Sequence, residues 1–173
     1  MEVMYTKAKA IIRNSLLHEC LSMPREISCG AVVFKKNQEV KYLLLHYEEG
    51  HWGFVKGNIE PNESEKDTVI RELEEETGII EAQFIEGFRE KMSYFYRRGG
   101  NTIYKEVVFF LIQTRESRVA LSSEHVGYKW LSYQKATERL TFNIAKSILK
   151  KAHQFLKNQD MHAQVERTKK ASG

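Results

Sequence analysis

Cysteine, proline and long hydrophobic runs are all scarce in this sequence of 173 residues. Its two cysteines, Cys20 and Cys29, are too few for a disulfide framework or a four-ligand zinc site, so a reducing compartment is the simpler expectation. No apolar run approaches the roughly 20 residues that a membrane-spanning helix needs, which argues against membrane insertion. The N-terminal segment also lacks the uninterrupted apolar stretch of a secretory signal, although its excess of basic residues leaves a transit peptide open. The sequence therefore predicts a cytoplasmic protein.

The chain does have enough length and apolar content for one domain with a core. It is 42% hydrophobic, and a chain of about this size is expected to bury roughly 68–70% of its unfolded surface. The net charge of +4 and the isoelectric point near 9.0 favour polyanionic partners.

Apolar runs rich in β-branched and aromatic residues predict strands at five places along the chain. These runs occupy residues 27–36, 40–48, 82–96, 104–114 and 127–132. The glycine pair in the segment "RRGGN" predicts a hairpin turn between the third and fourth strands, because glycine readily adopts a positive φ.

Helical patterns account for much of the remaining sequence. An N-terminal helix is expected within residues 3–22, where Met4, Ala8, Ile11, Ile12 and Ser15 share one face and Pro24 follows. An acidic helix is expected in the middle of the chain, and a last helix from about Tyr133 to Leu156, either continuous or with one break. Strands, one helix among them and one helix at the end predict a single α/β sandwich.

The acidic helix carries the densest charge in the sequence. Residues 57–79 contain eight carboxylates. Ser64 followed by Asp67 resembles a capping box and Gly78 is a typical helix terminator, which predicts a helix over about residues 65–77.

Two stripes of side chains follow from a rotation of 100° per residue along this helix. Val69, Ile70 and Leu73 form a narrow apolar stripe that is expected to face the core. A second stripe beside it consists of three carboxylates, Glu72, Glu75 and Glu76.

The carboxylate stripe is unfavourable for an isolated helix. Glu72 and Glu76 are a like-charge pair four residues apart, and all three carboxylates lie in the half of the helix whose dipole disfavours anions. A solvated acidic face is the simple explanation. Because several local rules are broken together beside the core, we favour a cation site, and hard oxygen ligands suit Mg²⁺ or Mn²⁺ carrying a phosphorylated substrate.

Two further residues extend this hypothesis. Arg71 projects beside Glu75 and could reach Glu63 in the preceding loop, where a bidentate contact would orient the carboxylates. A simple surface ion pair is the alternative. Gly57 precedes a turn that contains Asn58, Pro61 and Asn62, which would leave backbone carbonyl and amide groups free near the helix start.

The spacing from Gly57 to Ile79 resembles the Nudix box. That motif is Gly, five residues, Glu, seven residues, then Arg-Glu-apolar-any-Glu-Glu-any-Gly-apolar, and every fixed position matches. The resemblance implies an α/β/α sandwich with a mixed sheet that hydrolyses nucleoside diphosphate derivatives with Mg²⁺ or Mn²⁺. It further implies that the metal ligands are Glu72, Glu75, Glu76 and the Gly57 carbonyl, with Glu63 supporting and Arg71 orienting them.

Segments outside the box are similar to the asymmetric diadenosine tetraphosphate hydrolase branch of that family. They include "SCGAVVF", "WGFVKGNIEPNE", "IEGF", "YKEVVFFL", "SSEHVGYKWL" and "HQFL". The resemblance implies that Tyr94 and Tyr128 flank an adenine and that Lys56 and Lys105 offset phosphate charge. Glu124 would be a further metal ligand or the base, a role that Glu76 could also fill.

The resemblance implies the reaction and the extent of the central domain, while the patterns at the two ends of the chain suggest the segments that flank it. We expect an N-terminal helical extension at residues 1–25, a Nudix hydrolase domain at 26–157 and a mobile basic tail at 158–173. The expected reaction converts diadenosine tetraphosphate to ATP and AMP, with a small-molecule nucleotide as the partner.

Two departures from the branch keep other functions open. Val55 and Asn58 stand where the branch usually has proline and histidine, so a phosphate contact is missing. The extra N-terminal helix also lies outside the pattern. The alternatives are hydrolysis of another nucleoside diphosphate derivative or of an RNA 5′ end, and a nucleotide-binding module without catalysis.

Overall fold

A computed structural model describes residues 23–171. The chain divides into two compact units. The larger unit comprises Ile27–Met92 and Val107–Gly173, and the smaller comprises Met1–Glu26 and Ser93–Glu106. The helix expected within residues 3–22 lies outside the described residues, so it stays a prediction, as do the proposed domain boundaries.

In the described part of the chain, seven strands form one mixed sheet. Its strands are β1 (Arg25–Lys36), β2 (Val40–Tyr47), β3 (Trp52–Gly53), β4 (Val55–Asn58), β5 (Gln83–Arg98), β6 (Asn101–Gln113) and β7 (His125–Leu131). The order is β3-β2-β1-β6-β5, with β4 paired to β1 and β7 paired to β2, both antiparallel. Because β4 pairs with β1 and β7 pairs with β2, the end of β4 and the start of β7 lie beside the two strands on which the acidic helix packs.

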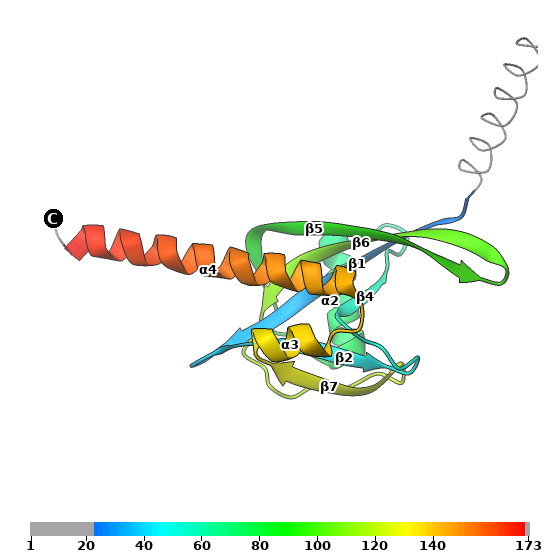
Figure 1. Cartoon of the computed structure of the whole chain (residues 1–173), viewed down its shortest axis with the longest axis horizontal. Coiled ribbons are helices and arrows are strands. Elements are labelled where there is room, and N and C mark those ends of the chain that lie inside the picture. The colour runs from blue at the N-terminus through cyan, green and yellow to red at the C-terminus, as the bar shows by residue number, and fades with distance from the viewer. Residues whose placement is uncertain (1–22, 172–173) are drawn as a thin grey trace, which may run out of the picture. The chain divides into compact units, whose positions relative to one another are not determined.

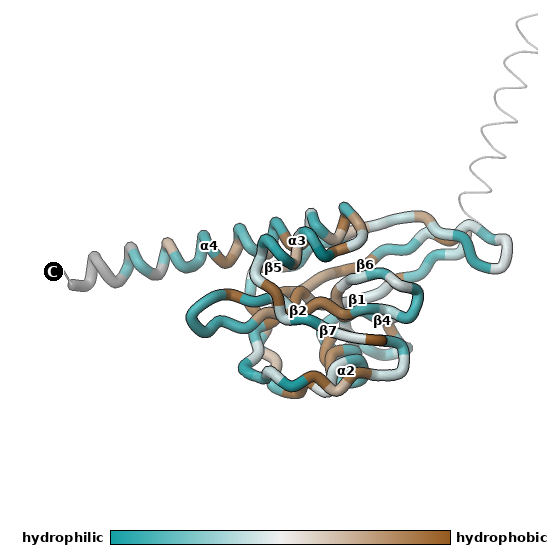
Figure 2. Tube along the Cα trace, turned by 60° about the horizontal axis from the view of Figure 1, so that its bottom comes forward, coloured by the Kyte–Doolittle hydropathy of each residue, from teal (hydrophilic) through white to brown (hydrophobic). Residues whose placement is uncertain are grey.

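Three helices are present among the described residues: α2 (Glu65–Thr77), α3 (Tyr133–Arg139) and α4 (Asn143–Ala171). Figure 1 shows these elements coloured in chain order. In the larger unit, α2 lies on one face of the sheet, and α3 and α4 lie on the other (Figure 2). Figure 2 shows the apolar central strands between these two layers. The predicted α/β/α sandwich with a mixed sheet is therefore confirmed.

Side chains of the central strands alternate between two hydrophobic layers. The layer under α2 contains Ala31, Val33, Leu43 and Leu45, together with Val69 and Leu73 of the helix. Buried residues on the opposite side come from even-numbered positions of β1 and β2, from α3 with its C-cap, and from α4. They are Val32, Phe34, Tyr42, Leu44, Ala136, Leu140, Ile148, Leu149 and Ala152. Both faces of the sheet are buried, which explains why these strands appear as continuous apolar runs in the sequence.

The last helix differs from the prediction in length. It was expected to end near Leu156, but α4 continues to Ala171 and includes most of the segment predicted as a tail. The physical reason is the absence of any helix terminator, because no proline occurs after Pro61 and no glycine occurs between Gly127 and Gly173. None of the described helices is long and apolar enough to span a membrane.

A histidine fixes α4 against β2. His153 stacks on Tyr133 with ring centroids 4.0 Å apart, and its Nδ1 lies 2.8 Å from the hydroxyl of the buried Tyr42. Lys36 at the end of β1 also forms an ion pair with Asp160 of α4, at 2.6 Å. These contacts lie on the face of the sheet opposite α2.

Candidate active site

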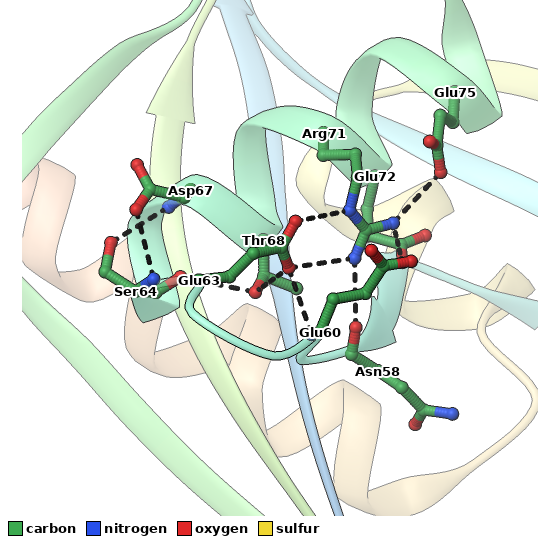
Figure 3. Close-up of polar contacts among 9 residues, drawn as sticks. All are labelled: Asn58, Glu60, Glu63, Ser64, Asp67, Thr68, Arg71, Glu72 and Glu75. Carbon is green, nitrogen blue, oxygen red and sulfur yellow. Dashed lines mark hydrogen bonds and ion pairs between the residues drawn. The ribbon is translucent and has the colours of Figure 1, made fainter.

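The ends of helix α2 are built as the sequence predicted. The Ser64 hydroxyl accepts a hydrogen bond from the Asp67 amide at 3.2 Å, and Asp67 Oδ2 accepts one from the Ser64 amide at 3.0 Å (Figure 3). Gly78 has φ 68° and donates its amide to the Glu74 carbonyl, which ends the helix. The carboxylate-bearing face is therefore held in register with the loop that precedes it.

Arg71 is bound on several sides in the centre of Figure 3. Its Nε and Nη2 donate to the two carboxylate oxygens of Glu63, at 2.7 and 3.1 Å. Nη1 donates to Glu72 at 2.7 Å and to Glu75 at 3.0 Å, and Nη2 also donates to the Asn58 carbonyl at 3.0 Å. The bidentate contact between Arg71 and Glu63 is thus present, and it belongs to a network rather than to an isolated surface pair.

The network changes the acidity of Glu63. The Arg71 guanidinium and the Thr68 hydroxyl both bond its carboxylate, and they lower the pKa of Glu63 to about 2. The same contacts raise the pKa of Arg71 above its ordinary value. Both groups therefore stay charged at neutral pH, and the loop before α2 is tied to the carboxylates of the helix.

We expect Arg71→Lys to disconnect this network. A lysine ammonium cannot form the two parallel bonds to Glu63 while also reaching Glu72, so both carboxylates lose their fixed orientation. Nucleotide hydrolysis is expected to fall about tenfold or more, by analogy with residues that orient metal ligands, and the melting temperature should fall. Steady-state rates and a melting curve, compared with Lys66→Arg at an exposed ion pair with Glu86, test this; unchanged activity would contradict it.

Glu72 lies directly against the backbone of β4. An added Cβ at Gly57 would overlap the Glu72 carboxylate, so only glycine permits this approach. Burial raises the pKa of Glu72, and the bond from Arg71 opposes that effect. Gly57 pairs with Cys29 of the central strand β1, so the carboxylate is placed against a rigid part of the sheet.

Glu76 is the most buried carboxylate of the helix. The residue is 4% exposed, and its Oε2 lies 3.4 Å from the Lys56 amide. Burial, with the charges of Glu72 and Glu124 adding to it, raises the pKa of Glu76 to about 8, although Lys56 opposes this. An anion in this position needs a cation close by to be stable in its charged form.

The predicted faces of the helix require one correction. Ile70 was expected to face the core, but it is 37% exposed, whereas Val69 and Leu73 are fully buried. The buried face is turned toward the carboxylate stripe and includes Glu76. The three carboxylates of the stripe differ in exposure. The side chains of Glu76 and Glu72 are 5% and 13% exposed, whereas that of Glu75 is 59% exposed.

The loop before β7 carries a further carboxylate. Glu124 is exposed. Besides burial, which is the main cause, its charge contributes to raising the pKa of both Glu72 and Glu76. The Ser122 amide donates to the Glu76 carbonyl at 3.3 Å and the Ala120 amide to the Thr77 carbonyl at 2.8 Å. The loop is therefore attached to the end of α2.

A basic and aromatic group lies on the other side of Glu76. The Lys56 ammonium is 4.4 Å from the centre of the Tyr47 ring and 3.4 Å from its hydroxyl. Tyr47 stacks on His51, with ring centroids 4.3 Å apart, and contacts His125 at 4.4 Å. Burial and the charge of Lys56 lower the pKa of His125 to about 4, so this ring is neutral.

The remaining predicted substrate contacts fall in two units. Tyr128 belongs to β7 in the larger unit, where it pairs with Leu45 and is 36% exposed. Tyr94 and Lys105 belong to the smaller unit, in which Lys105 contacts Glu26 at 3.3 Å. The adenine clamp formed by Tyr94 and Tyr128 therefore stays a prediction.

Comparison with known proteins identifies the family of this chain. The family model of the NUDIX domain matches residues 24–152. This chain belongs to the NUDIX family. The asymmetrical bis(5'-nucleosyl)-tetraphosphatases of Mus musculus and Rattus norvegicus are each 34% identical to it over 142 residues, which cover 75% of this chain and 94% of each relative. The crystal structure of a Caenorhabditis elegans Ap4A hydrolase binary complex superimposes with a TM-score of 0.66 and 27% identity, covering 77% of this chain and 98% of that one.

Two members of the site in this NUDIX protein were not singled out from the sequence. Tyr47 ends an apolar run and His125 begins a short strand, so both resembled core positions. The only sequence signal for His125 was its position directly after Glu124, and that signal does not distinguish a core residue from one that faces the site.

Proposed function

We propose that this protein hydrolyses diadenosine tetraphosphate asymmetrically, to ATP and AMP. The observation that carries the proposal is the match to the asymmetrical tetraphosphatases, which extends over nearly their whole length rather than over the box alone. The buried carboxylates of α2 support it, because they provide the chemistry that such a reaction requires.

We assign divalent metal binding to Glu72, Glu75, Glu76 and the Gly57 carbonyl, with Mg²⁺ or Mn²⁺ as the ion. Enzymes of this family generally use divalent metals. The residues fit such an ion, because Glu76 is buried beside like charges and Glu72 is fitted against a glycine backbone. Among residues 23–171 no three acidic, histidine or cysteine side chains already surround one point, so we expect the carboxylates to close on the ion as it binds. When bound, it neutralises phosphate charge and acidifies a coordinated water.

Different side chains of the protein have the remaining roles in the proposed reaction. Arg71 and Glu63 hold Glu72 in orientation. We assign the proton acceptor to Glu124, because its exposed carboxylate can turn toward the attacking water, whereas Glu76 is committed to the ion. The Lys56 ammonium would offset charge on the phosphate chain. Water adds to one phosphorus, the bridging P–O bond breaks, and the leaving phosphate carries the second nucleotide away.

The reaction can be tested with purified protein, diadenosine tetraphosphate and Mg²⁺ or Mn²⁺, with products separated by chromatography. Equal amounts of ATP and AMP are expected, and chelation of the metal should abolish the reaction. Two molecules of ADP per substrate would contradict asymmetric cleavage. Release of pyrophosphate or phosphate from RNA 5′ ends without dinucleotide cleavage would favour the RNA alternative instead.

Tyr128 gives a separate test of nucleotide binding. If its exposed ring stacks on an adenine, Tyr128→Ala removes roughly 1–3 kcal/mol of binding. The KM for the dinucleotide is then expected to rise about tenfold with kcat little changed, because uniform binding is lost. Tyr128→Phe serves as the control that keeps the ring. An unchanged KM together with a lower melting temperature would indicate a packing residue.

A further inference from the structure

His125 carries an unsatisfied polar atom at the edge of the carboxylate group. Its side chain is 0% exposed, and within residues 23–171 its Nε2 has no hydrogen-bond partner. The nearest acidic atom is Glu76 Oε2, at 3.8 Å. An N–H···O bond spans about 2.7–3.2 Å, so the two groups face each other across a gap slightly too long for a bond. Buried polar atoms are rarely left in this state without a reason.

The other nitrogen of the ring is held by the loop. His125 Nδ1 lies 3.1 Å from the Ser122 hydroxyl. If Ser122 donates this bond, the ring proton is on Nε2, which then points at Glu76 as a donor. The Ser122 amide donates to the Glu76 carbonyl at 3.3 Å. Ser122 therefore contacts both the backbone of Glu76 and the ring that faces its side chain.

We propose that His125 is a positioning residue, which donates its Nε2 proton to Glu76 when that carboxylate is ionised around a divalent ion. A movement of about 0.9 Å would bring the two atoms to bonding distance. The bond would engage Oε2 and so direct Oε1 of Glu76 toward the ion. This inference rests on the proposed metal-dependent function and adds a residue that acts through Glu76.

Two other roles for His125 predict different behaviour. A packing role depends on the volume of the ring and its contact with Tyr47, whose centroid is 4.4 Å away. It would be sensitive to any change in shape. A role as a direct metal ligand needs Nε2 without a proton, and an amide nitrogen could not replace it. The positioning role needs only a donor at the place of Nε2.

Asparagine and glutamine separate these roles, because their amides occupy the two ends of the histidine ring. His125→Asn puts an amide near Nδ1 and leaves Glu76 without a donor. His125→Gln puts an N–H donor near Nε2. Affinity for Mn²⁺ alone, measured by electron paramagnetic resonance without nucleotide, is the primary readout, followed by kcat and KM at saturating metal.

We expect His125→Asn to weaken Mn²⁺ binding about tenfold or more, as loss of a partner to a ligating residue generally does, and to lower kcat more than it raises KM. His125→Gln should stay within about threefold of the wild type for both quantities. Ser122→Ala, a smaller change for use if His125→Asn fails to fold, should weaken Mn²⁺ binding by loosening the ring. In a Glu76→Gln background, His125→Asn should have no further effect on Mn²⁺ binding.

His153→Asn is the matched control, because it removes the same ring from the opposite face of the sheet, where it contacts Tyr42 and Tyr133. It should lower the melting temperature and leave Mn²⁺ binding unchanged. The proposal is overturned if His125→Gln binds Mn²⁺ as poorly as His125→Asn, or if both bind like the wild type. It is also overturned if the wild type binds no Mn²⁺. If the wild type binds Mn²⁺ but leaves diadenosine tetraphosphate intact, the substrate assignment fails while the Mn²⁺ comparison still decides the role of His125.

Discussion

Replacement of Glu76 by glutamine is expected to lower kcat at least a hundredfold while the fold is kept. Glutamine has the same shape but cannot carry the negative charge that a divalent ion needs at this position. A hundredfold loss corresponds to about 2.7 kcal/mol of transition-state stabilisation. The melting temperature in chelator should stay the same or rise, because a neutral amide in this buried place avoids the cost of desolvating an anion.

The matching measurement is the stabilisation by metal. A ligand that binds only the folded state raises the melting temperature, so millimolar Mg²⁺ or Mn²⁺ should stabilise the wild type and have much less effect on Glu76→Gln. Glu74→Gln is the matched control, because Glu74 lies on the exposed side of the same helix and is not among the proposed ligands. A Glu76→Gln enzyme with full activity would refute the metal assignment.

Gly57→Ala is expected to have a comparable effect through a single methyl group. The added Cβ would overlap the carboxylate of Glu72, which must move away from the strand. Because Arg71 holds the same carboxylate at 2.7 Å, that movement should also disturb Glu63. We expect kcat/KM to fall by about a hundredfold, with weaker binding of Mn²⁺, and these two quantities are the measurements.

A second glycine in a strand provides the control for this substitution. At Gly127 of β7, the nearest atom to an added Cβ is His46 Cβ at 3.9 Å, which is an ordinary contact. Gly127→Ala should therefore leave the rate close to that of the wild type. If Gly57→Ala were equally harmless, Glu72 would not depend on its place against the backbone, and its role as a ligand would have to be reconsidered.

Features determined by local chemistry were the ones that the sequence predicted well. Ser64, Asp67 and Gly78 specify the ends of α2 through hydrogen bonds within a few residues, and the pair Gly99 and Gly100 specifies the hairpin between β5 and β6 through their positive φ angles. The contact of Arg71 with Glu63 was also inferred from spacing. Each of these depends on neighbours along the chain rather than on distant packing.

Features determined by packing were predicted less well. The buried face of α2 depends on the backbone of β4, which admits Glu72 at Gly57, so the centre of that face moves toward Glu76 and Ile70 becomes exposed. A rotation of 100° per residue cannot contain this information. The position of His125 likewise depends on hydrogen bonds between the loop and the end of the helix, which no periodicity in the sequence records.

The many bonds of Arg71 have a consequence for anyone who varies this site by mutation and selection. Because one guanidinium serves Glu63, Glu72 and Glu75 together, the effect of changing any of these carboxylates depends on whether Arg71 is still present. A library that varies these positions one at a time would find each single substitution harmful to activity. It would miss combinations of substitutions whose effects on activity are not additive. A different ligand arrangement is therefore expected to require changes at several of these residues at once.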